Sequence, residues 1–376
     1  MRRWLRHVFH LGTKELHSLR RDPVMVFLIV YVFTFAIWSV ASGVRTEVTD
    51  AAIAVVDEDR SELARRLVDA FQPPYFRSPA LIEPGEVDRV MDAGRYTFVL
   101  DIPPDFAADV LAGRQPALQV NIDATAITQA GIGLGYIQSI ALREAQRFAH
   151  EVEGGADLPL DLVVRARFNP NLQSSWFTAV MQLVNNVTML AIILVGAAVM
   201  RERERGTLEH LLVMPLTPSE IMVAKIWANG LVILIAALLS LRLVVEGMLQ
   251  VPVAGSVLLF AGGSALYLAS VTALGILLAT LTRSMPQFAL LTIPVIIVMN
   301  LLSGGSTPLE AMPDWLQLTV QILPSTHFVA FAQAVLYRGA ELGTVWPRLL
   351  AMLGIGAVYF LAALARFRAA LAAQQA

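Results

Sequence analysis

Six stretches of this chain are apolar enough and long enough to cross a lipid bilayer, and no other feature constrains its fold as strongly. A helix needs about 20 mostly apolar residues to span a hydrocarbon core of about 30 Å. The stretches lie at residues 24–44, 177–200, 226–248, 256–281, 286–303 and 346–365. Of the 376 residues, 56% are hydrophobic and only 15% are charged, which is too apolar for a soluble globular protein. The sequence therefore predicts an α-helical polytopic membrane protein with six transmembrane helices.

The first apolar stretch has a second interpretation, as a cleaved signal peptide. Ser39-Val40-Ala41 has the small-x-small pattern of a cleavage site. The stretch is longer than the usual apolar region of about 7–15 residues in a signal peptide, however, and the segment before it is also too long. Asp22-Pro23 instead matches a helix N-cap followed by proline at the first helical position. We therefore expect a retained first span at 24–44, after a cytoplasmic amphipathic segment at 1–23.

Basic residues are distributed unevenly between the two sides of the predicted spans. The segment before the first span contains Arg2, Arg3, Arg6, Lys14, Arg20 and Arg21. If this segment is cytoplasmic, the other basic residues that fall inside are Arg201, Arg203, Arg205, Lys225, Arg283, Arg366 and Arg368. The short outer loop at 249–255 has no basic residue. By the positive-inside rule, both chain ends are cytoplasmic, including a tail at 367–376.

A long segment at 45–175 separates the first span from the second, at 176–200, and has the composition of a soluble domain. Apolar alternation predicts strands at 51–56, 97–102 and 117–123. Helical patterns occur at 61–71, 86–94, 103–113 and about 125–152. The sequence therefore predicts an extracytoplasmic α/β domain inserted between the first two spans. Gly131, Gly133 and Gly135 lack the strand-to-helix context of a dinucleotide site and favour close packing or a helix break.

The sequence contains no recognisable catalytic or energy-supplying motif. Neither lysine lies in the glycine frame of a phosphate-binding loop, so the chain is not expected to bind ATP in that way. The motifs of zinc proteases and serine hydrolases are also absent, and the six histidines are scattered. We expect no catalytic residue, no metal site and no cofactor in this chain.

Polar residues inside the apolar stretches are the next candidates for function, because such residues are costly in lipid. The set comprises Asn185, Asn186, Arg242, Glu246 and Asn300. The asparagines fit either interhelical hydrogen bonds or a translocation path. Arg242 and Glu246 lie one helical turn apart and fit either a structural ion pair or a substrate contact.

A charged turn followed by two short helical pieces interrupts the apolar sequence at 201–218, RERERGTLEHLLVMPLTP. Leucines form an i, i+3, i+4 stripe on a helix of about two turns that ends at Pro215. These leucines are Leu208, Leu211 and Leu212. The letters TPSE at 217–220 then predict a capping box that starts the next helix. A helix this short is marginal alone, so its stripe needs a partner: lipid headgroups, the protein's own helix ends, or a separate protein.

Two blocks of residues resemble the permease subunits of ABC-2 type ABC transporters. The first contains the charged turn, Gly206-Thr207-Leu208-Glu209, Leu211-Leu212, Pro215-Leu216 and Lys225. The second contains Leu302-Ser303-Gly304-Gly305, Thr307-Pro308, the segment 312–317 and the segment 324–328. This second block resembles the YhhJ-like branch of the family, bacterial inner-membrane exporter permeases with a large periplasmic domain.

The resemblance implies a cytoplasmic coupling loop at 201–225, four further spans within 226–366 and an outer amphipathic segment near 306–345. In the family the first block contacts the ATPase, which implies a coupling role for Arg205, Gly206, Thr207, Leu208, Glu209, Leu211, Leu212 and Pro215. It also implies a homodimer or heterodimer of permeases in the lipid bilayer, with separate ATPase subunits that bind ATP and Mg. A HlyD-type periplasmic adaptor is a further implied partner, and nucleic acid is not.

These expectations combine into a permease subunit of an ATP-driven exporter that moves a hydrophobic or amphipathic small molecule across the inner membrane. A non-transporting receptor or assembly platform with an external domain is the alternative from another class. A secondary transporter is a third alternative, but such proteins more often have acidic residues deep in their spans and paired broken helices.

Overall fold

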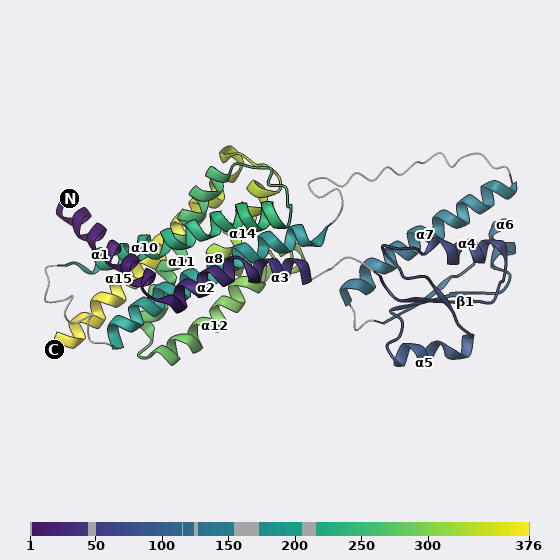
Figure 1. The fold of residues 1–376 in the computed structure, drawn as a ribbon, viewed down its shortest axis with the longest axis horizontal. Helices are drawn as coiled ribbons and strands as arrows, with labels where there is room; N and C mark the ends of the chain where they lie inside the picture. Colours follow the sequence, from purple (N-terminus) through teal and green to yellow (C-terminus); the bar gives the residue numbers. More distant parts are fainter. Residues whose placement is uncertain are drawn as a thin grey trace. The chain divides into compact units, whose positions relative to one another are not determined.

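A computed structural model describes residues 2–43, 50–114, 116–123, 127–153, 173–204 and 216–375. The chain divides into two compact units, and Figure 1 shows both. The helical unit consists of Met1–Gly43 and Ser175–Ala376, and the α/β unit consists of Val44–Ser174. The predicted fold class, a helical membrane protein with an inserted α/β domain, is therefore confirmed.

The helical unit contains the following elements: α1 (Arg2–Arg20), α2 (Pro23–Phe33), α3 (Phe35–Gly43), α8 (Ser174–Glu204), α10 (Pro218–Ser240), the π-helix η3 (Leu241–Met248), α11 (Val257–Leu281), α12 (Met285–Leu301), the short 3₁₀ turn η4 (Leu309–Ala311), α13 (Asp314–Val320), α14 (Pro324–Leu336) and α15 (Leu342–Gln375). Five continuous or nearly continuous helices in the described residues are long and apolar enough to cross a membrane: Pro23–Gly43, Ser174–Glu204, Pro218–Met248, Val257–Leu281 and Leu342–Ala369.

The described spans differ from the six predicted ones in the region after α11. The predicted span at 286–303 corresponds to α12, which is apolar but shorter than the other five helices. The following helices α13 and α14 are bent by 89° relative to each other, and together they form a broken span or a re-entrant loop. The sequence pattern predicted an amphipathic segment here, but it did not predict that nearly all of α14 is buried.

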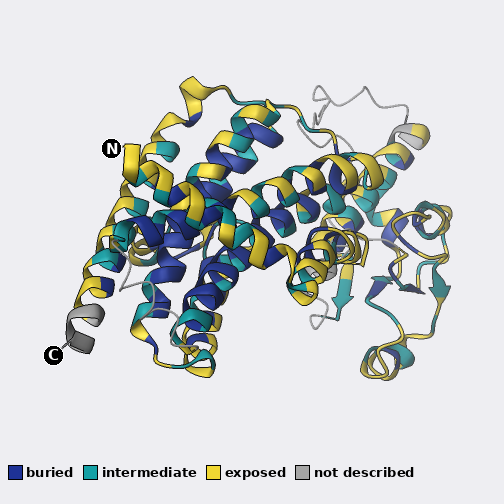
Figure 2. Cartoon of the chain, turned by 60° about the vertical axis from the view of Figure 1, so that its left-hand side comes forward, coloured by how far each residue is buried: buried dark blue, intermediate teal, exposed yellow. Residues whose placement is uncertain are grey.

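The core of the helical unit is formed by α8 and α11, which are mostly buried, whereas α15 and the α2–α3 pair are largely exposed. Figure 2 shows buried residues inside this unit and exposed residues on its outer helices. The exposed apolar surfaces are those expected of helices that face lipid. Both chain ends lie at the same end of the helical unit, as an even number of membrane crossings requires (Figure 1).

Two helix starts follow the local rules that the sequence predicted. The side chain of Asp22 accepts a hydrogen bond from the backbone N of Met25 at 3.2 Å, and Pro23 occupies the first turn of α2. Thr217 and Glu220 form the predicted capping box at the start of α10, with Pro218 in its first turn. Each cap satisfies backbone N–H groups that have no partner within the helix.

The α/β unit contains β1 (Ile53–Asp57), α4 (Glu62–Ala70), β2 (Ala80–Leu81), the 3₁₀ turn η1 (Pro84–Glu86), α5 (Val87–Asp92), β3 (Phe98–Ile102), α6 (Phe106–Leu111), β4 (Gln119–Ile122) and α7 (Ile127–Glu153). The strand order is β2-β1-β3-β4, with β1 parallel to β2 and β3 and with β4 antiparallel to β3. Ile53 pairs with Phe98, which fixes the register of the two central strands.

Helices cover both faces of this sheet. Residues of α4, α6 and α7 pack on one face, and α5 packs on the other (Figure 1). The close-packing interpretation is confirmed for Gly133, because a Cβ atom there would lie 2.2 Å from the ring of Phe98. The sequence predicted every strand except β2, which has only two residues.

Candidate functional site

The predicted coupling residues lie within 205–215, outside the residues that the structure describes. They are Arg205, Gly206, Thr207, Leu208, Glu209, Leu211, Leu212 and Pro215. The two flanks of this segment are described, and they are the end of α8 and the start of α10. The candidate site therefore consists of the contacts that hold these two flanks in place.

The end of α8 is tied to the connection between α11 and α12. A guanidinium nitrogen of Arg203 donates to the backbone carbonyl of Thr282 at 2.5 Å. A carboxylate oxygen of Glu204 accepts from the backbone N of Met285 at 2.8 Å, at the first residue of α12. Arg203 and Glu204 therefore bind backbone groups of a neighbouring connection, directly before the segment 205–215.

The start of α10 is tied to the amphipathic helix α1. Glu220 is buried although it belongs to the capping box, and one of its oxygens lies 3.0 Å from Nδ1 of His7. Two turns further along α10, the Nε1 of Trp227 donates to the backbone carbonyl of Val8 at 3.2 Å. A Cβ atom at Gly12 would lie 2.1 Å from the Trp227 ring, so only glycine permits this close approach of α1 to α10.

Lys225 joins both flanks to α1. Its ammonium group lies 2.7 Å from a carboxylate oxygen of Glu15 on α1 and 2.9 Å from one of Glu202 on α8. The side chain of Lys225 is only 4% exposed. A cation this deeply buried needs its carboxylate partners, because removal of either charge leaves the other poorly compensated. We call Glu15, Glu202 and Lys225 the three-helix charge cluster.

Two members of this cluster were not predicted from the sequence. Lys225 was identified as a cytoplasmic basic residue and as part of the block that resembles the permease family, whereas Glu15 and Glu202 were not singled out. Lysine is rare in this chain, with one residue at 14 and one at 225, and the second lies close to a predicted span. A lysine in that position indicates a nearby carboxylate, but its spacing does not identify which one.

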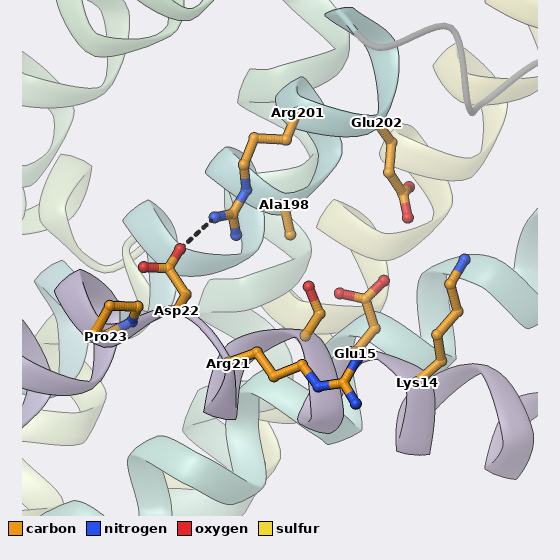
Figure 3. Close-up of a pocket in the computed structure, with 9 residues that line it drawn as sticks. Lys14, Glu15, Arg21, Asp22, Pro23, Ala198, Arg201 and Glu202 are labelled. Carbon is orange, nitrogen blue, oxygen red and sulfur yellow. Dashed lines mark hydrogen bonds and ion pairs between the residues drawn. The ribbon is translucent and has the colours of Figure 1, made fainter.

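A cavity of about 520 Å³ lies next to the charge cluster, between the end of α1, the start of α2 and the end of α8. Figure 3 shows its labelled side chains, with Lys14, Glu15 and Arg21 on one side and Arg201 and Glu202 on the other. Arg201 forms an ion pair with Asp22 at 3.0 Å across the cavity. The cap of the first span and the end of the second are thereby connected.

The polar residues predicted inside the spans have different environments. Asn186 is buried; its Nδ2 donates to the backbone carbonyl of Val32 at 2.8 Å, and its Oδ1 accepts from Gln182 at 3.0 Å. Asn185 and Asn300 are half-buried, and their side chains make no hydrogen bond within the described part of the chain. Asn186 therefore makes an interhelical hydrogen bond, which is one of the two roles that the sequence left open for the asparagines.

The carbonyl that Asn186 binds lies beside a break in the first span. The helix is interrupted at Thr34, between α2 and α3, and the last carbonyls of α2 need partners outside the helix. Asn186 supplies a donor to Val32, and the hydroxyl of Ser240 supplies one to Phe33. Ser240 is also the last residue of α10 before the π-helix η3, so irregularities in two spans meet at one point.

Arg242 and Glu246 form an ion pair at 2.6 Å on the π-helix η3, with 57% and 23% of their side chains exposed. The structure therefore brings these two residues together. No hydrogen bond or ion pair between described residues joins this pair to Asn185, Asn186 or Asn300.

The family profile described as ABC-2 family transporter protein matches residues 24–365. The inner membrane transport permease YhhJ of Escherichia coli (strain K12) is 50% identical over 366 residues, which cover 97% of this chain and 98% of that protein. The probable multidrug ABC transporter permease YbhR of the same organism is 31% identical over 94% of this chain and 96% of its own length. The probable multidrug ABC transporter permease YbhS is 28% identical over 89% of both chains.

Proposed function

The chain belongs to the ABC-2 family of transporter permeases, and from this premise we propose that it is the membrane subunit of an ATP-driven exporter in the inner membrane. A transport permease of this family is not itself an ATPase, so ATP and Mg are bound by a partner subunit. We propose that the substrate is a hydrophobic or amphipathic small molecule, a class consistent with the multidrug names of YbhR and YbhS. Family membership favours transport by an ABC system over the receptor and secondary-transporter alternatives.

We propose that the segment 205–215 docks on the partner ATPase. The observation that carries this proposal is the three-helix charge cluster, in which Lys225 contacts Glu15 and Glu202. Both flanks of the segment are held to α1 through buried contacts, and α1 leads directly into the first span. If the ATPase displaces this segment, α1, α8 and α10 therefore move together, because the charge cluster connects them.

Aspartate at Leu208 and Leu211 tests this docking. Charge in a desolvated contact costs a few kcal/mol, which weakens binding by roughly two orders of magnitude. We expect the Leu208→Asp/Leu211→Asp variant to insert normally, to lose copurification with its ATPase and to lose export. The measurement is the amount of ATPase recovered with the tagged permease from membranes, together with export of a test compound.

The matched control replaces the same two leucines with methionine, which conserves volume and hydrophobicity. This variant should retain both the ATPase and export. Normal recovery of the ATPase with the aspartate variant would assign the leucine stripe to the headgroups or to the protein's own helix ends, and would contradict the docking proposal.

For the translocation path we propose the polar positions within the spans: Asn185, Asn186, Arg242, Glu246 and Asn300. Arg242 is the strongest of these, because its partly exposed side chain has one carboxylate partner on its own helix. If Arg242 and Glu246 contact the substrate, Arg242→Ala and Glu246→Gln reduce export while the amount of folded permease in membranes stays constant. A parallel loss of folded protein would instead make the pair structural.

We propose an assembly of two permease copies, homodimeric or heterodimeric, with a HlyD-type adaptor on the α/β unit. The exposed apolar helices of the described helical unit leave surface for a second copy. Two differently tagged copies expressed together should copurify if the permease is a homodimer. Recovery of a related permease, and not of the second tagged copy, would indicate a heterodimer.

A further inference from the structure

The cavity between α1, α2 and α8 lies where two spans leave the hydrocarbon. Pro23 is in the first turn of the first span, and Arg201 directly follows the apolar residues of the second span. Both residues line the cavity. Because helix ends of this kind lie among the lipid headgroups, the cavity is accessible to phospholipids of that leaflet.

Three side chains face the cavity from α1 and from the residue that directly follows it. Lys14 and Ser18 belong to α1, and the backbone N of Arg21 still donates to the carbonyl of His17 at 3.2 Å. The spacing i, i+4, i+7 therefore puts Lys14, Ser18 and Arg21 on the same helical face. Within the described part of the chain, neither Lys14 nor Arg21 has an ion pair, and the hydroxyl of Ser18 has no hydrogen bond. These groups are two cations and a hydroxyl donor that are available to bind a ligand from outside the described residues.

The remaining charges around the cavity are already paired. Arg201 binds Asp22, and Lys225 contacts both Glu15 and Glu202. The lining contains three cations and three carboxylates, so with Lys225 included the region has one excess positive charge at neutral pH. A ligand with one negative charge balances this excess.

We infer that this cavity binds the phosphodiester headgroup of an anionic membrane phospholipid, with Lys14, Ser18 and Arg21 as its ligands. A phosphodiester has one negative charge and accepts hydrogen bonds from ammonium, guanidinium and hydroxyl groups. A volume of about 520 Å³ is within the range of small-molecule sites. Val24 and Phe27 at the start of α2 are exposed and provide apolar surface for the acyl chains. The residues that line this site differ from those proposed for the translocation path.

The test uses the full chain, purified in detergent, and measures its thermal unfolding midpoint against the concentration of added lipid. The probes are short-chain phosphatidylglycerol, short-chain phosphatidylcholine and inorganic phosphate. We expect a saturable increase of the midpoint with phosphatidylglycerol, because a ligand that binds only the folded state stabilises it. The zwitterionic lipid and the free phosphate should give much smaller shifts at equal concentration.

The variant Lys14→Gln/Arg21→Gln should weaken the phosphatidylglycerol affinity by about tenfold or more, because it removes two charge-assisted hydrogen bonds. Both side chains are exposed, so the variant should fold. The matched control is Arg2→Gln/Arg3→Gln, which removes the same charge from exposed positions of α1 that do not line the cavity. This control should keep the wild-type affinity.

Three results would overturn the inference. An equal loss of affinity in the control variant would show general attraction to a basic helix and no site. An equal shift with phosphatidylcholine would show binding through the acyl chains alone. An equal shift with inorganic phosphate would assign the cavity to a free anion and not to a lipid.

Discussion

At the scale of single residues, the most informative side chain is Lys225, because its two partners come from distant parts of the sequence. Glu15 is 210 residues away along the chain, and Glu202 lies on the other side of the coupling segment. No local pattern indicates this arrangement. The lysine itself was recognisable in the sequence, but its partners depend on tertiary packing that spacing alone does not specify.

We predict that Lys225→Met lowers the stability of the permease by about 3–5 kcal/mol, because it leaves the half-buried carboxylates of Glu15 and Glu202 without their cation. The matched control is Lys14→Met, the same change at an exposed lysine that has no ion pair among the described residues. The measurement is the unfolding midpoint of both variants in detergent without added phospholipid.

A further change from Glu202 to Gln in the Lys225→Met background should recover part of the loss, since one of the two uncompensated charges is removed. If Lys225→Met is no more destabilising than Lys14→Met, the charge cluster does not hold the three helices together.

At the scale of secondary-structure elements, two neighbouring helices donate hydrogen bonds to backbone carbonyls at the break in the first span. Asn186 binds the carbonyl of Val32, and Ser240 binds that of Phe33. We predict that Asn186→Leu destabilises the helical unit by about 1 kcal/mol, because the Val32 carbonyl then lacks a partner in an apolar environment.

The neighbouring residue provides the control for this change. Asn185→Leu alters the same residue type at a half-buried position without a side-chain hydrogen bond among the described residues, so its effect should be smaller. The comparison is made by unfolding both variants under identical conditions. Equal effects of the two substitutions would mean that the hydrogen bond to the break contributes nothing specific.

Structural features that depend on neighbouring residues in the sequence were predicted. Features that depend on contacts between distant helices were not. The caps at Asp22 and at Thr217 depend on neighbouring residues, and both are present as expected. The break at Thr34, the π-helix after Ser240 and the buried position of α14 depend on contacts with other helices. The apolar pattern gave no indication of them, because a broken span and a continuous span have the same hydropathy.

At the scale of the whole molecule, the distribution of charge determines the direction in which the chain crosses the membrane. Basic residues are concentrated in α1 and in the last turn of α8, and both chain ends lie at one end of the helical unit (Figure 1). The positive-inside rule predicts that this end is cytoplasmic, on the side where ATP is available to a partner subunit. We therefore expect the α/β unit on the outer side, because it is inserted in the sequence between the first two spans.

We predict that an enzyme reporter active only outside the inner membrane is active when fused near residue 110, in the α/β unit, and inactive when fused near residue 210. A reporter active only in the cytoplasm should give the opposite result at the same two positions, which controls for fusions that fail to fold. The reason is that crossing in the reverse direction would carry the basic residues of α1 and of the last turn of α8 across the bilayer. Activity of the external reporter near 210, with none near 110, would reverse the topology and place the coupling segment on the side without ATP.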